Sequence, residues 1–206
     1  MTVPAYSAIS SYSRVRLLRL LQLGAKRTIS ELCAATGLHA NTVREHLQRL
    51  IEGGYIVAET EHRTTRGRPR VLYSAAGMGA VSSPVARRKA REAAKRGDLM
   101  RRVMPWAESG ELPTAALHQL DALTEDLTAA GFDPLIDETE LTVDLTPCLH
   151  ATALAEHRQA LCAAHLGLMQ SVVNEAGGPL SVDRIQESCD PTKCVVLLST
   201  RQVANR

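Results

Sequence analysis

The sequence lacks the patterns that would assign it to a membrane or to a common class of enzyme. No stretch of 18 consecutive apolar residues occurs, so we expect no membrane-spanning helix. The first residues do not combine a basic segment with an apolar core, so we expect no secretion signal and a cytoplasmic location. A phosphate-binding glycine loop, an HExxH motif, a CxxC redox motif and a Ser-His-Asp arrangement are also missing. The sequence therefore favours a protein that is not an enzyme.

Acidic residues are scarce in the first half of the chain, although the 206 residues together carry a formal charge of only +2. Residues 1–110 contain 19 Lys and Arg against 8 Asp and Glu, a net charge of +11. Residues 111–206 contain 5 against 14, a net charge of −9. The basic half suits a polyanion, because neutralised phosphates release counterions, whereas the acidic half should stay away from one.

Two helices joined to a third by a short turn are predicted near the N-terminus. In residues 13–23 the apolar side chains lie along one side, which predicts a buried amphipathic helix. Thr28 and Glu31 have the spacing of a capping box, so a second helix is expected to begin there. Gly37 is expected to end it, because a left-handed residue is needed at that point.

The third predicted helix covers residues 40–52, and Gly53-Gly54 stops it. Its apolar residues Val43, Leu47 and Leu50 face inward and leave a polar face outside. Arg can bind guanine in bidentate fashion, Asn can bind adenine, and the first turns of such a helix usually make these contacts. The alternative is a merely solvated face. The candidate DNA contacts around this helix are His39, Asn41, Thr42, Arg44 and His46.

Two predicted strands, residues 55–60 and 70–74, bracket the loop RTTRGRPR, which contains four arginines and no acid. Gly67 permits a tight turn, and Pro69 suits a strand edge where no donor is needed. Contact with phosphates or insertion into the minor groove is the expected use, and a solvated run of charge is the alternative. Helix, turn, helix and basic hairpin together predict a winged helix-turn-helix domain that binds double-stranded DNA. The candidate contacts in the wing are Arg63, Arg66, Arg68 and Arg70.

The rest of the chain reads as a connector and a second domain. A small-residue linker precedes the basic, alanine-rich and helix-prone segment ARRKAREAAKRGDLMRRVMPW, which we interpret as a connector and dimer helix. Phosphate contact and a solvated connector are the alternatives. Later in the chain we expect helices that pack on an antiparallel sheet. The predicted elements are a helix over residues 114–130, strands over 132–137 and 140–145, a helix over 151–175, and strands over 180–187 and 194–200.

The sequence thus predicts an α+β protein with three parts. They are a winged helix-turn-helix domain over residues 1–77, a basic linker or dimer helix over residues 78–113, and a small α+β cysteine-containing domain over residues 114–206.

Four of the five cysteines fall in the last part: Cys148, Cys162, Cys189 and Cys194. His165 shares a helical face with Cys162, because the two are three residues apart. Sulfur ligands from a strand end, a helix and a hairpin can converge on one centre, and they select zinc, copper(I) or an iron–sulfur cluster. The alternative is that these cysteines only fill the core.

Two segments resemble known families. ISELCAATGLHANTVREHLQRLIEGGYI resembles the winged-helix domain of ArsR/MarR-type bacterial regulators, and GRP in the wing is typical of that group. LTPC…ALCAAHLGLMQSVVNEAGGPLSVDRIQESCDPTKCVVLL resembles the C-terminal domain of winged-helix regulators that include the iron–sulfur biogenesis repressors. This second resemblance implies a cluster held by Cys148, Cys162 and Cys194, with His165 in the matching C-x-x-H-L-G-L run.

The chain departs from that group at two points. Cys148-Leu149-His150 stands where the group has a start like Cys-Pro-Phe, and Cys189 stands where an apolar residue is frequent. The fourth ligand is therefore open between Cys189 and His165, and the cluster between the 4Fe–4S and 2Fe–2S types.

The resemblance implies a homodimeric transcriptional regulator, a repressor or an activator. Its operator affinity would depend on an iron–sulfur cluster that senses redox state, iron or nitric oxide. The alternatives are a winged-helix regulator with a zinc site, or one with a small-molecule-binding C-terminal domain. In each case the expected partners are double-stranded DNA and a second copy of the chain, and no membrane.

Overall fold

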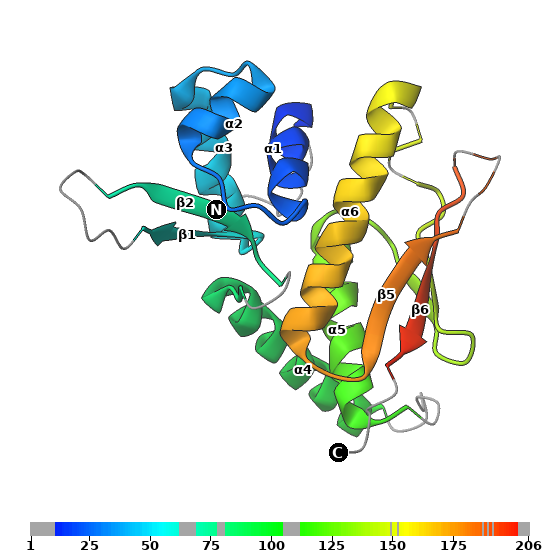
Figure 1. Cartoon of the computed structure of the whole chain (residues 1–206). Coiled ribbons are helices and arrows are strands. Elements are labelled where there is room, and N and C mark those ends of the chain that lie inside the picture. Colours follow the sequence, from blue (N-terminus) through cyan, green and yellow to red (C-terminus); the bar gives the residue numbers. More distant parts are fainter. Residues whose placement is uncertain are drawn as a thin grey trace.

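A computed structural model describes residues 11–61, 69–77, 81–104, 112–148, 150–151, 153–186, 188, 190 and 192–201. The chain begins with three helices, α1 (Tyr12–Gln22), α2 (Ile29–Thr36) and α3 (Ala40–Gly53). An antiparallel hairpin of β1 (Ile56–Thr60) and β2 (Val71–Ala75) follows, and it projects to one side of the helices (Figure 1). This is the order of elements that the sequence predicts for a winged helix-turn-helix domain.

Local signals in the sequence fix the ends of α2 and α3. The Thr28 hydroxyl accepts a hydrogen bond from the Glu31 backbone, and the Glu31 carboxylate accepts one from the Thr28 backbone at 2.7 Å, so the predicted capping box is confirmed. Gly37 ends α2 with a φ of 73° and Gly54 ends α3 with a φ of 84°. Both values lie in the left-handed region, which glycine enters without a steric cost.

The loop of the hairpin falls outside the described residues, and with it Arg63, Arg66 and Arg68. Of the predicted wing contacts, the structure places only Arg70, which is exposed next to the start of β2. Its carbonyl accepts a hydrogen bond from the Glu61 backbone at 2.8 Å, which continues the pairing of the hairpin one step toward its loop.

Three longer helices follow the hairpin: α4 (Pro84–Val103), α5 (Thr114–Ala129) and α6 (Ala155–Ala176). Ser83 caps α4, and Pro84 at its first position has no donor to lose. α5 packs against both α4 and α6. None of the helices in the described ranges is long and apolar enough to cross a membrane.

The second sheet contains β3 (Leu135–Asp137), β4 (Thr142–Asp144), β5 (Leu180–Ile185) and β6 (Val195–Thr200). Its strand order is β3-β4-β6-β5 with every pair antiparallel. The α+β class is thus confirmed, with shorter elements than the sequence suggests. The strand predicted from residue 132 begins at Leu135 because Phe132 is turned into the core, where it is 5% exposed.

One continuous hydrophobic core joins the N-terminal domain to the C-terminal helices and sheet, and its members include Leu17, Leu47, Leu123 and Val196. α1 lies beside the first half of α6 (Figure 1). The winged-helix domain therefore rests directly on the helix that carries Cys162.

Candidate functional site

The predicted DNA-reading face lies on α3. Val43, Leu47 and Leu50 are at most 1% exposed, so the predicted inner face of α3 is correct. Asn41 and Arg44 are exposed on the opposite side, and an Arg44 guanidinium nitrogen donates to the Asn41 amide oxygen at 2.8 Å. This hydrogen bond joins two side chains that lie one helical turn apart. Arg44 is the side chain that can bind guanine, and Asn41 is the one that can bind adenine.

Three other predicted DNA contacts around α3, His39, Thr42 and His46, are not freely available side chains. His39 caps α3, because its Nδ1 accepts a hydrogen bond from the Asn41 backbone at 3.3 Å. His46 is half-buried, and no described residue bonds its enclosed Nδ1. Burial, together with the nearby charge of Arg14, lowers the pKa of His46, so the ring offers no positive charge to a phosphate at neutral pH. Thr42 is also half-buried.

Sequence reasoning did not include Gln48 among the contacts, although it is exposed and lies one turn beyond Arg44. Its amide donates to the Glu52 carboxylate at 2.9 Å. The signal that could have found it is its spacing of four residues from Arg44, which places both side chains on one helix face.

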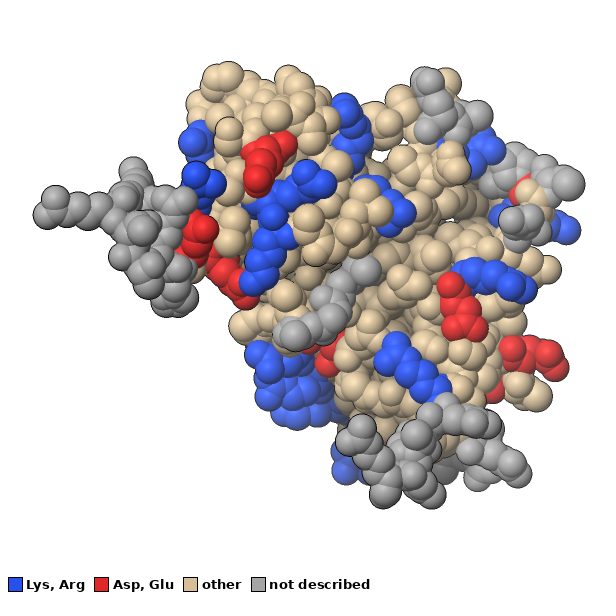
Figure 2. All heavy atoms as spheres, viewed as in Figure 1, with Lys and Arg blue, Asp and Glu red and all other residues tan. Residues whose placement is uncertain are grey.

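A second basic surface lies on α4, where Lys and Arg side chains gather beneath the hairpin (Figure 2). The members of this surface are exposed at spacings of three and four residues, and they are Arg87, Arg88, Arg91 and Lys95. The predicted basic helix is therefore present, with one face open to solvent.

Two of the four late cysteines, Cys148 and Cys194, lie together at one end of the second sheet. Cys148 follows β4 and Cys194 directly precedes β6, and both are buried, 9% and 4% exposed. The Leu145 backbone donates to the Cys194 carbonyl at 2.8 Å, and the Cys148 backbone donates to the Thr192 carbonyl at 2.6 Å. These bonds hold the two segments together and set the two thiols side by side.

The ionisation of these thiols follows from the contact between Cys148 and Cys194. A hydrogen bond from the Cys194 thiol, aided by the charge of Arg158, lowers the pKa of Cys148 to about 6. The same contact raises the pKa of Cys194. Burial raises the pKa of Cys162, and the negative charge of Cys148 raises it further. Of the two protons on the Cys148–Cys194 pair, one therefore dissociates readily and the other is retained.

His165 and His150 complete this region. His165 is 4% exposed, and its ring stacks on Phe132 with centroids 4.7 Å apart. Burial, with the adjacent His150, lowers the pKa of His165 to about 3. The ring is therefore neutral at physiological pH, and neutral imidazole is the form that ligates metals. The Nε2 atom of His150 is enclosed and has no hydrogen-bond partner among the described residues.

The donors suit a metal or a cluster in chemistry but are not arranged as a finished site. Three thiols and an unsatisfied imidazole nitrogen are the soft and intermediate donors that zinc and iron–sulfur centres use. Within the described ranges, no group of three or more His, Cys, Asp and Glu side chains is placed so that it could hold a metal ion. Cys189, one of the two candidates for a fourth ligand, lies outside those ranges.

Comparison with known proteins agrees with the N-terminal geometry. Residues 11–57 match the family model described as winged helix-turn-helix DNA-binding, a range that runs from α1 to the start of β1. No curated protein and no solved structure matches the chain. The family match and the fold together support a DNA-binding domain of the kind that transcriptional regulators carry, and they assign nothing to the C-terminal part.

Proposed function

We propose that the chain is a homodimeric transcriptional regulator whose operator affinity depends on an iron–sulfur cluster held by its late cysteines. The observation that carries the proposal is the direct packing of α1, in the DNA-binding domain, on the part of α6 that bears Cys162 and His165. A change among the thiols therefore has a short path to the domain that meets DNA.

The contact between α1 and α6 is close and specific. The buried Gln22 side chain of α1 donates to the Ala164 carbonyl at 3.0 Å, between Cys162 and His165. A Cβ atom added at Gly167, one turn further on, would lie 2.5 Å from the Gln22 amide nitrogen. Because packed interiors do not deform smoothly, a shift of α6 at Cys162 is expected to move α1 with it.

A second contact joins the same helices at the other end of α1. The Tyr12 ring stacks on the His157 ring with centroids 3.8 Å apart. His157 lies in the first turn of α6, so both ends of α1 contact the half of α6 that carries Cys162. The DNA-binding domain is thus held at two points.

The residues that would hold the cluster are Cys148, Cys162 and Cys194, with Cys189 or His165 as the fourth ligand. When bound, an iron–sulfur cluster supplies a centre that accepts and releases electrons and reacts with oxidants. The chain contributes a readily formed Cys148 thiolate, which is the ligating form of cysteine, and a buried neutral His165. A tetrahedral zinc site is the alternative occupant, because it uses the same residue types.

Dimerisation follows from how such a domain reads DNA. One α3 helix reaches only a few base pairs, and two copies on a dyad read half-sites roughly 34 Å apart or a multiple of this. The exposed face of α4, with both basic and apolar side chains, is the surface that we assign to contacts with the second copy.

The decisive experiment is anaerobic purification from iron-replete cells, with assays for iron, sulfide and zinc on the same sample. We expect a brown protein with visible absorption that Cys148→Ser and Cys194→Ser abolish. The matched control is Cys33→Ser, since Cys33 lies half-buried on α2, away from the other thiols. A colourless protein that contains zinc would show that the site holds zinc, the alternative occupant. A protein free of both metals contradicts the proposal and favours a small-molecule-binding C-terminal domain.

DNA binding is measured on the same preparations. Duplexes containing candidate operators, titrated at low and moderate salt, should bind with different affinity before and after removal of iron. Equal affinity in both states would still be consistent with a DNA-binding domain, but it would refute the regulatory role of the cysteines.

A further inference from the structure

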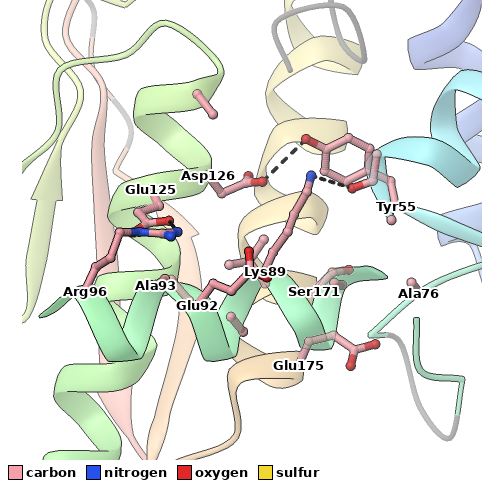
Figure 3. A pocket seen from close by; sticks show the side chains of 17 residues that line it. Tyr55, Ala76, Lys89, Glu92, Ala93, Arg96, Glu125, Asp126, Ser171 and Glu175 are labelled. Carbon is pink, nitrogen blue, oxygen red and sulfur yellow. Dashed lines mark hydrogen bonds and ion pairs between the residues drawn. The ribbon is translucent and has the colours of Figure 1, made fainter. Parts of the chain in front are cut away.

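A cavity of about 220 Å³ lies where the end of α3 meets α4, α5 and α6 (Figure 3). Gly53, Gly54 and Tyr55 form the wall that belongs to the DNA-binding domain. Small residues form much of the opposite wall, including Ala93 on α4 and Ala122 on α5. Because a side chain larger than alanine would fill it, the cavity exists through this choice of residues.

One carboxyl group reaches into this largely apolar space. Asp126 on α5 and Lys89 on α4 both point toward Tyr55 (Figure 3). The Tyr55 hydroxyl donates to Asp126 at a long 3.4 Å, while Lys89 donates to the Gly53 carbonyl at 2.9 Å and lies over the Tyr55 ring. Asp126 therefore has one weak hydrogen bond and an acceptor oxygen left for another donor. Burial raises the pKa of its carboxyl to about 6, although the nearby charge of Lys89 and the Tyr55 hydrogen bond both act to lower it.

The other charged groups of the lining already have partners, and Glu92 lies 4.0 Å from Arg88. Arg96 donates two hydrogen bonds to Glu125, and Glu175 accepts from the Ser82 hydroxyl and the Ser83 backbone. The lining contains four carboxylates against two cationic side chains. A positively charged ligand complements this excess of negative charge.

The volume limits the ligand to about the size of a single ring. A cavity of roughly 150 Å³ accommodates benzene, whereas sites for drug-sized molecules start at about 300 Å³. We infer that this cavity binds a small organic amine, with its ammonium group on Asp126 and Tyr55 and its apolar body against Ala93 and Ala122. The site is separate from the cysteines and uses none of their side chains.

Binding at this place has a consequence for DNA recognition, and this step rests on the proposed function. The ligand would touch the last residues of the recognition helix on one side and α4 and α5 on the other. A ligand shifts an equilibrium only through different affinities for two states, so any effect on DNA requires that α3 and α5 sit differently when DNA is bound.

The test uses isothermal titration of the full chain, without DNA, with 2-phenylethylamine, 2-phenylethanol and 3-phenylpropanoate. The amine should bind saturably and about tenfold more tightly than either analogue, since a hydrogen-bonded charge is worth about that ratio. Asp126→Asn should remove this preference, and Ala122→Leu should abolish binding by filling the cavity. Asp133→Asn, an exposed acid just after α5, is the matched control and should bind like the parent.

Equal binding of the alcohol, a preference for the carboxylate, or amine binding unchanged in Asp126→Asn would overturn the proposal. If Ala122→Leu does not fold, amide NMR shifts of the parent protein replace it. Changes centred on Gly54, Ala93 and Asp126 support the site, and changes confined to other regions refute it. Because these titrations contain no DNA, their failure is distinguishable from a failure of the regulator to bind its operator.

Discussion

The side chains proposed to contact DNA are exposed on one helix, whereas those proposed to bind a cluster are buried and come from three segments. Asn41 and Arg44 lie outside the core that holds α3 in place. Cys148, Cys194 and His165 are each at most 9% exposed and belong to the core itself. Changes on α3 should therefore alter binding without altering stability, while changes around the thiols should alter both.

The contrast also bears on how one region would control the other under the proposed function. An exposed reading face has no neighbour that could report on a distant event, so control has to reach it through the helices beneath. Here α1 is that helix, because it packs on α6 on one side and on α3 on the other.

Gln119→Leu should destabilise the C-terminal unit by about 3 kcal/mol, because several buried backbone groups lose their partner at once. The Gln119 amide donates to the carbonyls of Val173 and Leu180 and accepts from the Leu180 backbone, at 2.8–3.0 Å. Urea unfolding measures the loss. Gln170→Leu is the matched control, since Gln170 makes a single, half-buried bond to the Val182 carbonyl at 3.1 Å. Equal losses in the two variants would show that Gln119 is not a special support.

Gly167→Ala should cost roughly 1–2 kcal/mol of unfolding free energy, since the new methyl group displaces the buried Gln22 amide and alanine recovers part of this loss through its higher helix propensity. Gln22→Ala loses its bond to the Ala164 carbonyl but opens the space. The double variant should therefore be more stable than the sum of the two single effects predicts. Additive effects in this cycle would mean that α1 and α6 are not coupled at this contact, and the route from the thiols to DNA would be lost.

Local features of this fold can be predicted from the sequence, whereas contacts between distant elements cannot. The Thr28–Glu31 capping box and Gly37 act within a few residues, so spacing alone identifies them. That Cys148, Cys162 and Cys194 share one centre stays a prediction, drawn from their element types and from the resemblance. Nothing local indicates that Gln22 reaches Ala164 across 142 positions, since a buried glutamine looks like any surface glutamine.

Two further features needed the structure for similar reasons. His46 has the helical position of an outward residue, yet it is half-buried and lies near the charge of Arg14 on α1, which the sequence of α3 alone does not reveal. The cavity at the end of α3 depends on alanines from separate helices, and alanine in a helix is too common to signal a binding site.

Arg44→Ala should weaken operator binding by roughly 1–2 kcal/mol and relax the preference at one base pair, while leaving stability within about 0.5 kcal/mol. The side chain is exposed, and its bond to Asn41 lies on the surface, so the fold loses little. Fluorescence anisotropy with operator variants measures the preference. Arg184→Ala removes the same charge from an exposed position on β5 and serves as the control. A stability loss as large as the affinity loss would contradict the separation of reading face and core.

The smallest expected effect concerns Asp126, which joins the C-terminal helices to the DNA-binding domain through Tyr55. Burial raises the pKa of this carboxyl from 3.8 to about 6. A group that holds its proton more tightly in the folded state stabilises the fold at low pH, and that contribution is lost as the pH rises from 3.8 through about 6. Asp126→Asn should remove this part of the decline in unfolding free energy. Tyr55→Phe should instead move it to higher pH, because the hydroxyl no longer stabilises the carboxylate. Urea unfolding at a series of pH values measures both, and superimposable profiles for parent and Asp126→Asn would show that the junction between the two regions does not depend on this acid.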